Sequence, residues 1–394
     1  MRFVPANCLR EGMKLGRNVY SQENVVLLAK DVILTEKYIK DIHKLVINGV
    51  YIEDALSENI RIENIISEGL RISAVKSIKK IYNNPKNIGK TLDTVERIAK
   101  SMMQEILNSK SIMINMIDIK TYDDYMYSHS VNVGVLCAVM GIALNLEETK
   151  IQKLITSALL HDIGKVFIPK EIVDKKENLT DQDKKMIRSH SEKGYRYIKQ
   201  HYNIPITSYV GILQHHERYD GKGYPDGKKG EAISIFGRII RICDAYDNLI
   251  TETPTKKAYL PSDAIEYIMA YNGTIFDPKL VKIFLKKVAP YPLGTIVILS
   301  NGKKGIVVKN NEECSTRPII KLIPDEGEEK KLQGKHGRID NTKEYKQIEQ
   351  AKNKQVKNLK GEESDDLEPD ETVGIYDLLQ DWNYRNITIT GVEQ

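Results

Sequence analysis

The chain has 394 residues, with 59 basic and 54 acidic side chains and 41% hydrophobic residues. This length suits two or three domains, and the near balance of charge argues against a nucleic-acid polymer as a partner. Four scattered cysteines, Cys8, Cys137, Cys243 and Cys314, give no disulfide framework, and no segment reads as a signal peptide or membrane span, so we expect a cytoplasmic protein.

Residues 1–54 are expected to form a small α/β module. Asn24 to Leu34 is rich in Val, Ile and Leu and is interrupted by Lys30-Asp31, which predicts a hairpin. Thr35 to Val46 is predicted to be a short helix, and Val50 to Glu53 a strand. This module could sense a signal, form a dimer interface or simply pack on the rest of the chain.

Residues 55–119 have a mostly helical pattern, with a break at Asn83-Asn84-Pro85. We therefore expect a helical connector that leads into the next segment. In that segment lie five of the eight histidines, which are His129, His161, His190, His215 and His216. Four of them and Asp244 follow one another at intervals of roughly 30 residues, about one helical hairpin each. Packed helices can each point one such side chain at a shared metal centre.

Local patterns support helices around these residues. Ile151, Leu154, Ile155, Ala158 and Leu159 form an amphipathic stripe that places His161 and Asp162 in the last helical turn before Gly164. Thr180 and Asp183 resemble a capping box that opens a helix continuing through His190 to Ile198. Both faces of the helix around Asp244 are apolar, which predicts a buried carboxylate, and buried carboxylates are usually paired or bind metals.

Each of these residues also has an ordinary structural explanation. A histidine on an apolar face, such as His129, is usually a hydrogen-bonded core residue. His161 and Asp162 could form a hydrogen bond at a helix end, and Asp244 could be a cap or an ion-pair partner. Gly221, Gly223, Pro225 and Gly227 could form a simple turn. The turn directly follows His215-His216-Glu217, however, which suggests that it forms a wall of the same site. The ordinary explanations would also have to be correct for all of these residues at once, which we regard as less plausible than a metal site.

Residues 289–394 are expected to form a small β-rich domain. Ala289 to Gly294 marks a boundary, Thr295–Ser300 and Gly305–Lys309 predict a hairpin around Asn301-Gly302, and Pro318–Ile323 predicts a third strand. The charged segment 325–371 is expected to be a mobile insertion. Asn386 to Thr390 could return as a last strand, and Trp382 is expected to anchor packing.

The segment from about Tyr122 to Val288 resembles an HD-GYP domain, a branch of the HD phosphohydrolase superfamily. The resemblance rests on His129-Ser-Val-Asn-Val, His161-Asp162-Ile-Gly-Lys165, His190 with Gly194, His215-His216-Glu217, Asp220-Gly-Lys-Gly-Tyr-Pro225 and Asp244-Ala-Tyr-Asp247. It implies a mainly α fold, in which an all-helical HD-type catalytic domain at 120–288 lies between the α/β module and the β-rich domain.

The resemblance also implies a site. Its metal ligands would be His129, His161, Asp162, His190, His215, His216 and Asp244, with Asp162 bridging two divalent metals, iron or manganese. Asp162 and Lys165 would be catalytic. Substrate would contact Lys165, the loop residues Gly223, Tyr224 and Pro225, and Lys256. The implied reaction is hydrolysis of cyclic di-GMP by a metal-bridging hydroxide, giving linear pGpG and in some members GMP.

Two positions depart from the family pattern. Thr253 stands where many members have an arginine that contacts substrate, and Tyr125 stands where members with a third metal have a glutamate, with Asp123 and Asp124 out of register. We therefore expect two metals rather than three. Another nucleotide substrate remains an alternative, as does a receptor that binds cyclic di-GMP without hydrolysing it. A homodimer and a signalling partner of either flanking module are left open.

Overall fold

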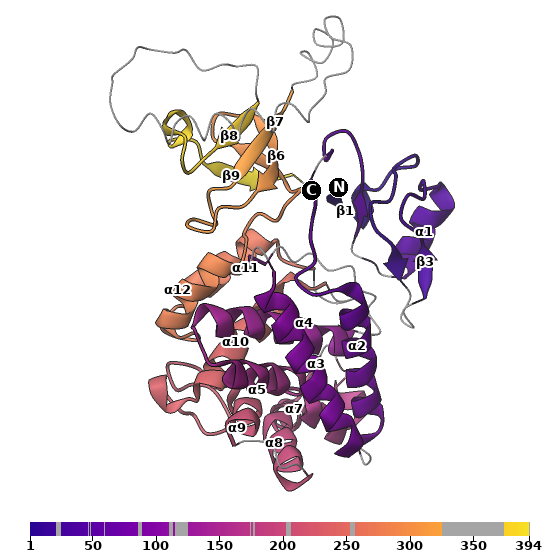
Figure 1. The fold of residues 1–394 in the computed structure, drawn as a ribbon. Coiled ribbons are helices and arrows are strands. Elements are labelled where there is room, and N and C mark those ends of the chain that lie inside the picture. The colour runs from indigo at the N-terminus through magenta and orange to yellow at the C-terminus, as the bar shows by residue number, and fades with distance from the viewer. Residues whose placement is uncertain are drawn as a thin grey trace, which may run out of the picture.

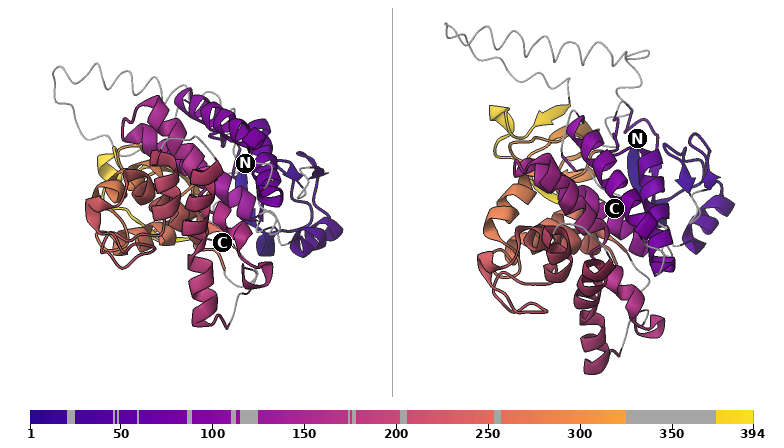
Figure 2. Two further views of the ribbon diagram at one scale, coloured as in Figure 1. Left: turned by 90° about the horizontal axis from the view of Figure 1, so that it is seen from below. Right: turned by 60° about the horizontal axis from the view of Figure 1, so that its bottom comes forward.

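The computed structural model describes residues 1–20, 25–45, 47, 49–58, 60–85, 89–109, 113–114, 125–173, 175, 178–201, 206–252, 257–324 and 374–393. Its centre is helical, and two small parts containing β-strands lie at the same end of the helices (Figure 1). Two further views show the N-terminal part on one side of this end and the C-terminal sheet on the other (Figure 2). The predicted mainly α fold is therefore confirmed.

The N-terminal part combines two short antiparallel strand pairs with one helix. Its elements are β1 (Arg2–Pro5), η1 (Ala6–Cys8), β2 (Val19–Tyr20), β3 (Val26–Leu28), α1 (Glu36–Lys44) and β4 (Gly49–Ile52). Strand β1 pairs with β4 and β2 with β3, and Thr35 caps α1 by accepting a hydrogen bond from the Tyr38 amide. The predicted helix and last strand are confirmed. The predicted hairpin within 24–34 is wrong, because β3 pairs with β2 and Ile33 bridges to Lys14.

The central helices are α2 (Glu68–Asn83), α3 (Gly89–Leu107), α4 (Tyr125–Ala143), α5 (Glu148–Leu159), η4 (Ile163–Phe167), α6 (Lys170–Val173), α7 (Asp181–Arg188), α8 (His190–His201), α9 (Ile206–Gln214), η5 (Gly230–Ala232), α10 (Ile235–Ile250), α11 (Pro261–Ala270) and α12 (Pro278–Lys287). All except α6, α7 and η5 contribute residues to one shared hydrophobic core. Helix α4 packs against α2, α3, α5, α10 and α12. It is the central element on which the other helices are arranged.

Two helix boundaries differ from the prediction. Helix α5 ends at Leu159, so His161 and Asp162 lie in the turn that follows it rather than in its last turn. Thr180 does form a capping box with Asp183, but the helix it opens stops at Arg188, and a new helix begins at His190. Both breaks occur beside a histidine. His161 and Asp162 thus lie outside a helix, and His190 begins a new one, so all three can point at a common centre.

One segment of α4, Met126–Ala143, is long and apolar enough to cross a bilayer by length and composition alone. The sequence analysis found no such segment, so that expectation is corrected. Most of this segment is buried against the neighbouring helices, and a buried core helix meets the same criterion. A helix that is apolar on all sides is what a central position in the bundle requires.

The C-terminal part is a five-stranded antiparallel sheet in the order β8-β7-β6-β5-β9. Its elements are β5 (Ile296–Leu299), β6 (Lys304–Lys309), β7 (Ile319–Ile323), β8 (Ile375–Asp377), η6 (Trp382–Tyr384) and β9 (Ile389–Val392). The predicted hairpin, third strand and last strand are confirmed, whereas β8 was not predicted. The predicted mobile insertion at 325–371 lies outside the described residues.

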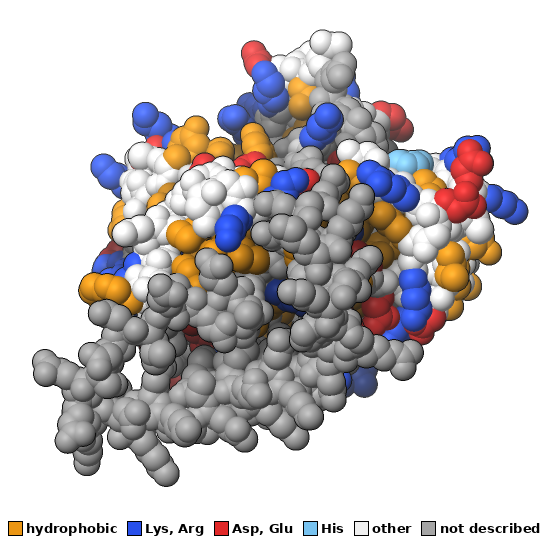
Figure 3. All heavy atoms as spheres, turned by 90° about the horizontal axis from the view of Figure 1, so that it is seen from above, with side chains coloured by type: hydrophobic (Ala, Val, Ile, Leu, Met, Phe, Trp, Pro, Cys, Tyr) orange, Lys and Arg blue, Asp and Glu red, His pale blue; other side chains and the backbone are white. Residues whose placement is uncertain are grey.

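Trp382 was expected to anchor packing, and that expectation is wrong. It is 77% exposed, and the Arg385 guanidinium lies 4.4 Å from the centroid of its ring. The small core of the sheet is formed instead by residues such as Val297, Ile320 and Leu378. Seen from the end with both flanking parts, basic and acidic side chains are interspersed over the described surface (Figure 3). This mixture fits the near balance of charge in the sequence.

Hydrophobic residues form separate clusters in the N-terminal part, the helices and the sheet. A fourth cluster joins Tyr51, Ile60 and Ile62 to Ile306 of the sheet, so the two flanking parts contact each other. The boundaries 1–54, 55–119, 120–288 and 289–394 remain predictions.

Candidate metal centre

The seven predicted ligands come from distant parts of the chain and converge between the helices. His129 lies on α4, His161 and Asp162 in the turn after α5, and His190 at the first position of α8. His215 and His216 follow the last residue of α9, and Asp244 lies on α10. All are buried except His216, which is half-buried. The structure thus brings together every one of these predicted residues.

The first group contains His129, His161 and Asp244, and each offers one donor atom within 4.8 Å of the others. The His129 Nε2 atom lies 3.1 Å from Asp244 Oδ1, and the His161 Nε2 atom lies 3.8 Å from the same oxygen. Asn248, one helical turn after Asp244, donates to that oxygen at 2.6 Å. This arrangement of two imidazoles and a carboxylate could hold one divalent metal ion.

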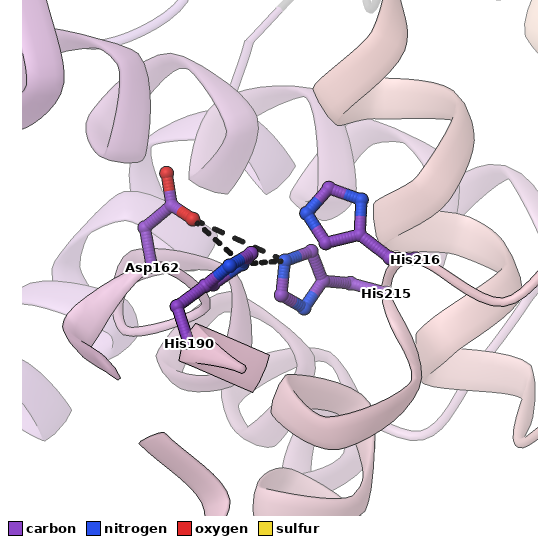
Figure 4. A group of neighbouring side chains, drawn as sticks. All are labelled: Asp162, His190, His215 and His216. Atoms are coloured by element: carbon purple, nitrogen blue, oxygen red, sulfur yellow. Dashed lines mark hydrogen bonds and ion pairs between the residues drawn. The ribbon is translucent and has the colours of Figure 1, made fainter. Parts of the chain in front are cut away.

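The second group contains Asp162, His190, His215 and His216, again with donor atoms within 4.8 Å of one another. Figure 4 shows the three imidazoles and the carboxylate pointing toward one another. The His190 Nε2 atom lies 3.3 Å from Asp162 Oδ1 and 3.1 Å from His215 Nε2. This second group could hold another metal ion.

Asp162 lies between the two groups. Its Oδ1 faces His190 and His215, at 3.3 and 4.0 Å from their Nε2 atoms, whereas its Oδ2 lies 3.4 Å from His161 Nε2. Oδ2 also accepts a hydrogen bond from the Lys165 ammonium. Burial alone would raise the pKa of Asp162, but Lys165 and the neighbouring imidazoles hold it well below its usual range. Asp162 is therefore ionised and placed to serve both groups.

Three of the imidazoles are oriented by the backbone. Nδ1 of His161 donates to Ala158 O at 2.7 Å, Nδ1 of His190 to Ile187 O at 2.7 Å, and Nδ1 of His215 to Ile212 O at 2.6 Å. A carbonyl oxygen can only accept, so each Nδ1 carries a proton and Nε2 is the ring atom that faces the centre. Metal-bound histidines are typically oriented in this way.

The positions of these lone pairs fit a cation. The Nε2 atoms of His190 and His215 face each other at 3.1 Å although neither neutral ring has a proton there to share. The buried Nε2 of His161 has no hydrogen-bond partner within the described residues. A buried polar atom without a partner destabilises the fold. A divalent metal between these atoms would remove the repulsion between the two lone pairs and give His161 Nε2 a partner.

Electrostatics in the two groups differ. Burial and the adjacent imidazoles lower the pKa of His215 and of His216 well below the usual value, and burial lowers that of His190. These rings are neutral, as metal ligands must be. Burial also opposes charge on His129, but Asp244 and Asp247 raise its pKa to about 9. A positive charge is thus favoured beside Asp244, where a metal would supply it.

Gly164 explains the close approach of the ligand turn to α8. A Cβ at this position would lie 1.8 Å from His190 O and 2.6 Å from Gly194 N, both of them backbone atoms. No larger residue fits without moving η4 away from α8. The glycine therefore lets Asp162 and His190 reach the same centre.

The loop after His216 forms one wall of the site. Gly223 packs on the backbone of Glu217 and Arg218, where a Cβ would lie 2.5 Å or less from the nearest atoms, the closest being Arg218 N at 2.3 Å. Tyr224 stacks on His216, with ring centroids 4.7 Å apart, and is joined to Pro225 by a cis peptide bond. Buried Glu217 accepts a hydrogen bond from the Asp226 amide at 2.8 Å. The loop is thus fastened to the ligand segment.

Some functional residues were missed by sequence reasoning. Asp247 accepts a hydrogen bond from His129 Nδ1 at 2.8 Å, and Asn132 donates to Asp247 at 2.7 Å. The Arg188 guanidinium lies 5.5 Å from the centre of the Tyr224 ring. A signal for the first two existed, since Asp247 and Asn132 each lie three residues after a predicted ligand on a helix, near the same face.

Other predicted residues are not placed. Lys256 and Thr253 lie outside the described residues, as do Asp123 and Asp124, and the side chain of Tyr125 is not described. A cavity of about 1110 Å³ lies between the N-terminal part, the end of α10 and the sheet. Its wall includes Asp247 but none of the seven predicted ligands.

Comparisons with known proteins place the centre in a family. The sequence profile of the HD domain matches residues 88–280, so the match begins in the predicted helical connector, well before residue 120. The cyclic di-GMP phosphodiesterase PA4108 of Pseudomonas aeruginosa is 33% identical over 218 residues, which cover 55% of this chain and 52% of that protein. The response regulator RpfG of Xanthomonas campestris, also a cyclic di-GMP phosphodiesterase, is 37% identical over 145 residues, covering 36% and 38%.

A 3'3'-cGAMP-specific phosphodiesterase of Vibrio cholerae is 30% identical over 161 residues, covering 40% of this chain and 31% of that protein. The chain thus spans about half, or less, of the length of these relatives. Residues 88–280 therefore match the HD domain family, and the chain is similar to cyclic di-GMP phosphodiesterases, in agreement with the HD-GYP resemblance.

Proposed function

We propose that the protein is a metal-dependent phosphodiesterase that hydrolyses cyclic di-GMP to linear pGpG, and further to GMP where the product is retained. The observation that carries the proposal is the pair of His/Asp groups joined through Asp162. Bound divalent metal ions would supply Lewis acidity and an activated water for attack on the phosphodiester. Seven residues would hold them, which are His129, His161, Asp162, His190, His215, His216 and Asp244.

We propose iron or manganese as the natural metal. Imidazole donors suit iron, and carboxylate donors suit manganese, and the two groups mix both kinds. The first group has two imidazoles and Asp244, and the second has three imidazoles and Asp162. The expected stoichiometry is two metals per chain, which elemental analysis of anaerobically purified protein measures.

The residues around the centre have separate roles in this proposal. Asp162, ionised and in contact with both groups, would serve as a ligand common to both metals. Lys165, whose side chain is partly exposed, lies beside Asp162 and would give a positive charge to the phosphoryl oxygens as negative charge builds there. Tyr224 would present a flat surface next to His216 for a guanine base.

The choice of cyclic di-GMP rests on the relatives. The two phosphodiesterases with the highest similarity described above act on cyclic di-GMP by name, whereas a relative with lower identity is named for 3'3'-cGAMP. Lys256 is proposed to contact a substrate phosphate as well. Thr253, in place of an arginine, removes one cationic contact from that wall.

The decisive experiment incubates manganese- or iron-loaded full-length protein with cyclic di-GMP, 3'3'-cGAMP and cyclic di-AMP in parallel, and separates the products by chromatography. We expect pGpG to appear fastest from cyclic di-GMP, and Asp162→Ala to give none. Faster hydrolysis of 3'3'-cGAMP or cyclic di-AMP would make that nucleotide the proposed substrate instead. Tight binding of cyclic di-GMP without any product, in protein shown to hold two metals, would instead make it a receptor.

A further inference from the structure

We propose that Arg71 is a positioning residue of the metal centre, acting through Asn132 and Asp247 on the imidazole of His129. Arg71 lies on α2, which precedes residue 88, the start of the match to the HD domain. The inference rests on the proposed function only in requiring that His129 binds a metal. It gives the segment before the HD domain a part in metal binding, through the residues that orient His129.

Three hydrogen bonds connect Arg71 to His129. The Arg71 Nη1 group donates to Asn132 Oδ1 at 2.7 Å, and Asn132 Nδ2 donates to Asp247 Oδ1 at 2.7 Å. The other carboxylate oxygen of Asp247 accepts from His129 Nδ1 at 2.8 Å. Because a carboxylate can only accept and a guanidinium can only donate, both ends of this chain have a fixed direction, and the Asn132 amide has one orientation.

The direction of these hydrogen bonds determines which ring nitrogen of His129 faces the metal centre. With its proton on Nδ1, the ring presents Nε2 beside Asp244 Oδ1, at 3.1 Å. Unlike the other three imidazoles with described Nδ1 contacts, His129 is oriented by a side chain rather than by a backbone carbonyl. Its orientation therefore depends on what holds Asp247 in place.

Because these residues are buried, each member of the hydrogen-bond series depends on the next for its partner. The side chains of Asn132 and Asp247 have no exposed surface, so water does not replace a lost partner. A buried carboxylate is stable only when hydrogen-bonded and charge-compensated, and Arg71 brings a permanent positive charge to it through the polarised amide. Without Arg71, the Asn132 amide could rotate and turn its oxygen toward Asp247.

Helix α2 holds Arg71 firmly enough for this role. Ser67 caps the helix, and its backbone amide and hydroxyl both donate to the Glu105 carboxylate of α3, at 2.5 and 2.8 Å. Ala74 and Ile78 of α2 are fully buried in the core shared with α4. Arg71 thus projects from a rigid element, as a positioning residue must.

The test measures metal binding without any substrate. Mn²⁺ is titrated into metal-free full-length protein and followed by electron paramagnetic resonance, for the natural protein and for Arg71→Met, Arg71→Lys and Arg97→Met. We expect Arg71→Met to weaken one of the two Mn²⁺ sites by about tenfold or more, the usual loss when a residue supporting a ligand is removed. The other site should keep its affinity, and Arg71→Lys should recover most of the loss.

Arg97 is the matched control, because this exposed arginine of α3 contacts only Asp93 and Thr94 of its own helix among the contacts described for it. Arg97→Met should leave both affinities unchanged. Equal affinities in the natural protein and in folded Arg71→Met would overturn the proposal. If Arg71→Met does not fold by circular dichroism, Arg71→Gln, which is too short to reach Asn132, decides in the same way.

The outcome is separable from that of the proposed function. A selective loss of one Mn²⁺ site in Arg71→Met, in a protein that hydrolyses no cyclic dinucleotide, would support the positioning role and reject the enzyme. Product formation together with unchanged Mn²⁺ affinities in Arg71→Met would do the reverse.

Discussion

The histidines of the two metal groups are oriented in two different ways. His161, His190 and His215 donate to backbone carbonyls three residues earlier, whereas His129 donates to the side chain of Asp247. A carbonyl three residues away is fixed by the local turn and cannot be removed by substituting a side chain. Asp247 lies 118 residues from His129 and depends in turn on Asn132. The first kind of support is local and robust, and the second is distant and open to adjustment.

Removing the residue common to both groups should have the largest effect. Asp162→Ala deletes the carboxylate that contacts both His161 and His190. The histidines would stay oriented, but the ligand common to both metals would be lost. We expect hydrolysis of cyclic di-GMP to fall to the background rate, with less than two metals bound per chain by elemental analysis. Full hydrolysis by this variant would place the reaction elsewhere in the protein.

Breaking the local support requires a change in the backbone packing. Gly164→Ala would place a Cβ 1.8 Å from His190 O, and this clash must move η4 or α8. We expect the free energy of unfolding to fall by about 3 kcal/mol or more, measured in urea.

Gly69→Ala is the matched control, because a Cβ on this residue of α2 would meet no atom within 4 Å. It should leave stability unchanged or raise it by up to about 1 kcal/mol, since alanine favours a helix over glycine. Similar losses in both variants would show that Gly164 is not required by close packing.

Breaking the distant support should spare the fold. Asp247→Asn keeps the size of the side chain, but its amide can turn a donor toward His129 Nδ1 and so favour the wrong tautomer. We expect about 10- to 100-fold weaker Mn²⁺ binding at one site only. Calorimetric titration of metal-free protein measures this. Equal weakening at both sites would contradict the separation between the two kinds of support.

Sequence reasoning found the ligands and missed most of what holds them. Imidazole and carboxylate are few and chemically distinctive, so His161-Asp162 and His215-His216 could be recognised from residue type and spacing. Asn132 and Arg71 are ordinary residues whose role exists only because α2, α4 and α10 pack together. Periodicity carries no information about such contacts between distant helices.

Two predictions near the ends of the chain were wrong for other reasons. The apolar run from Asn24 to Leu34 was predicted to be a hairpin from its composition and the interruption at Lys30-Asp31, but β3 pairs with the preceding strand, Val19–Tyr20. Trp382 was expected to anchor packing, yet the sheet core is formed by aliphatic residues and Tyr376. The break between α7 and α8 at Ser189 has no signal in the local sequence.

The smallest expected effect concerns the loop rather than the ligands. Glu217→Gln keeps an acceptor for the Asp226 amide but removes the carboxylate charge from that hydrogen bond in a fully buried position. The difference between a charged and a neutral hydrogen bond is about 1.5 kcal/mol at most, which corresponds to roughly a tenfold change. We expect KM for cyclic di-GMP to rise by up to that factor with kcat nearly unchanged, in steady-state assays. A fall in kcat alone would instead tie Glu217 to the metals.

The central helix α4 sets a condition on the synthesis of the chain. Its apolar surface is covered by α2, α3 and α5, and also by α10 and α12, which ends at Lys287. The ribosome therefore finishes α4 long before the last of its neighbours has been made. Until then, one side of a helix apolar enough to enter a bilayer stays uncovered. Nascent chains that end before α12 should consequently bind chaperones or aggregate, and they should do so more than chains that extend past it.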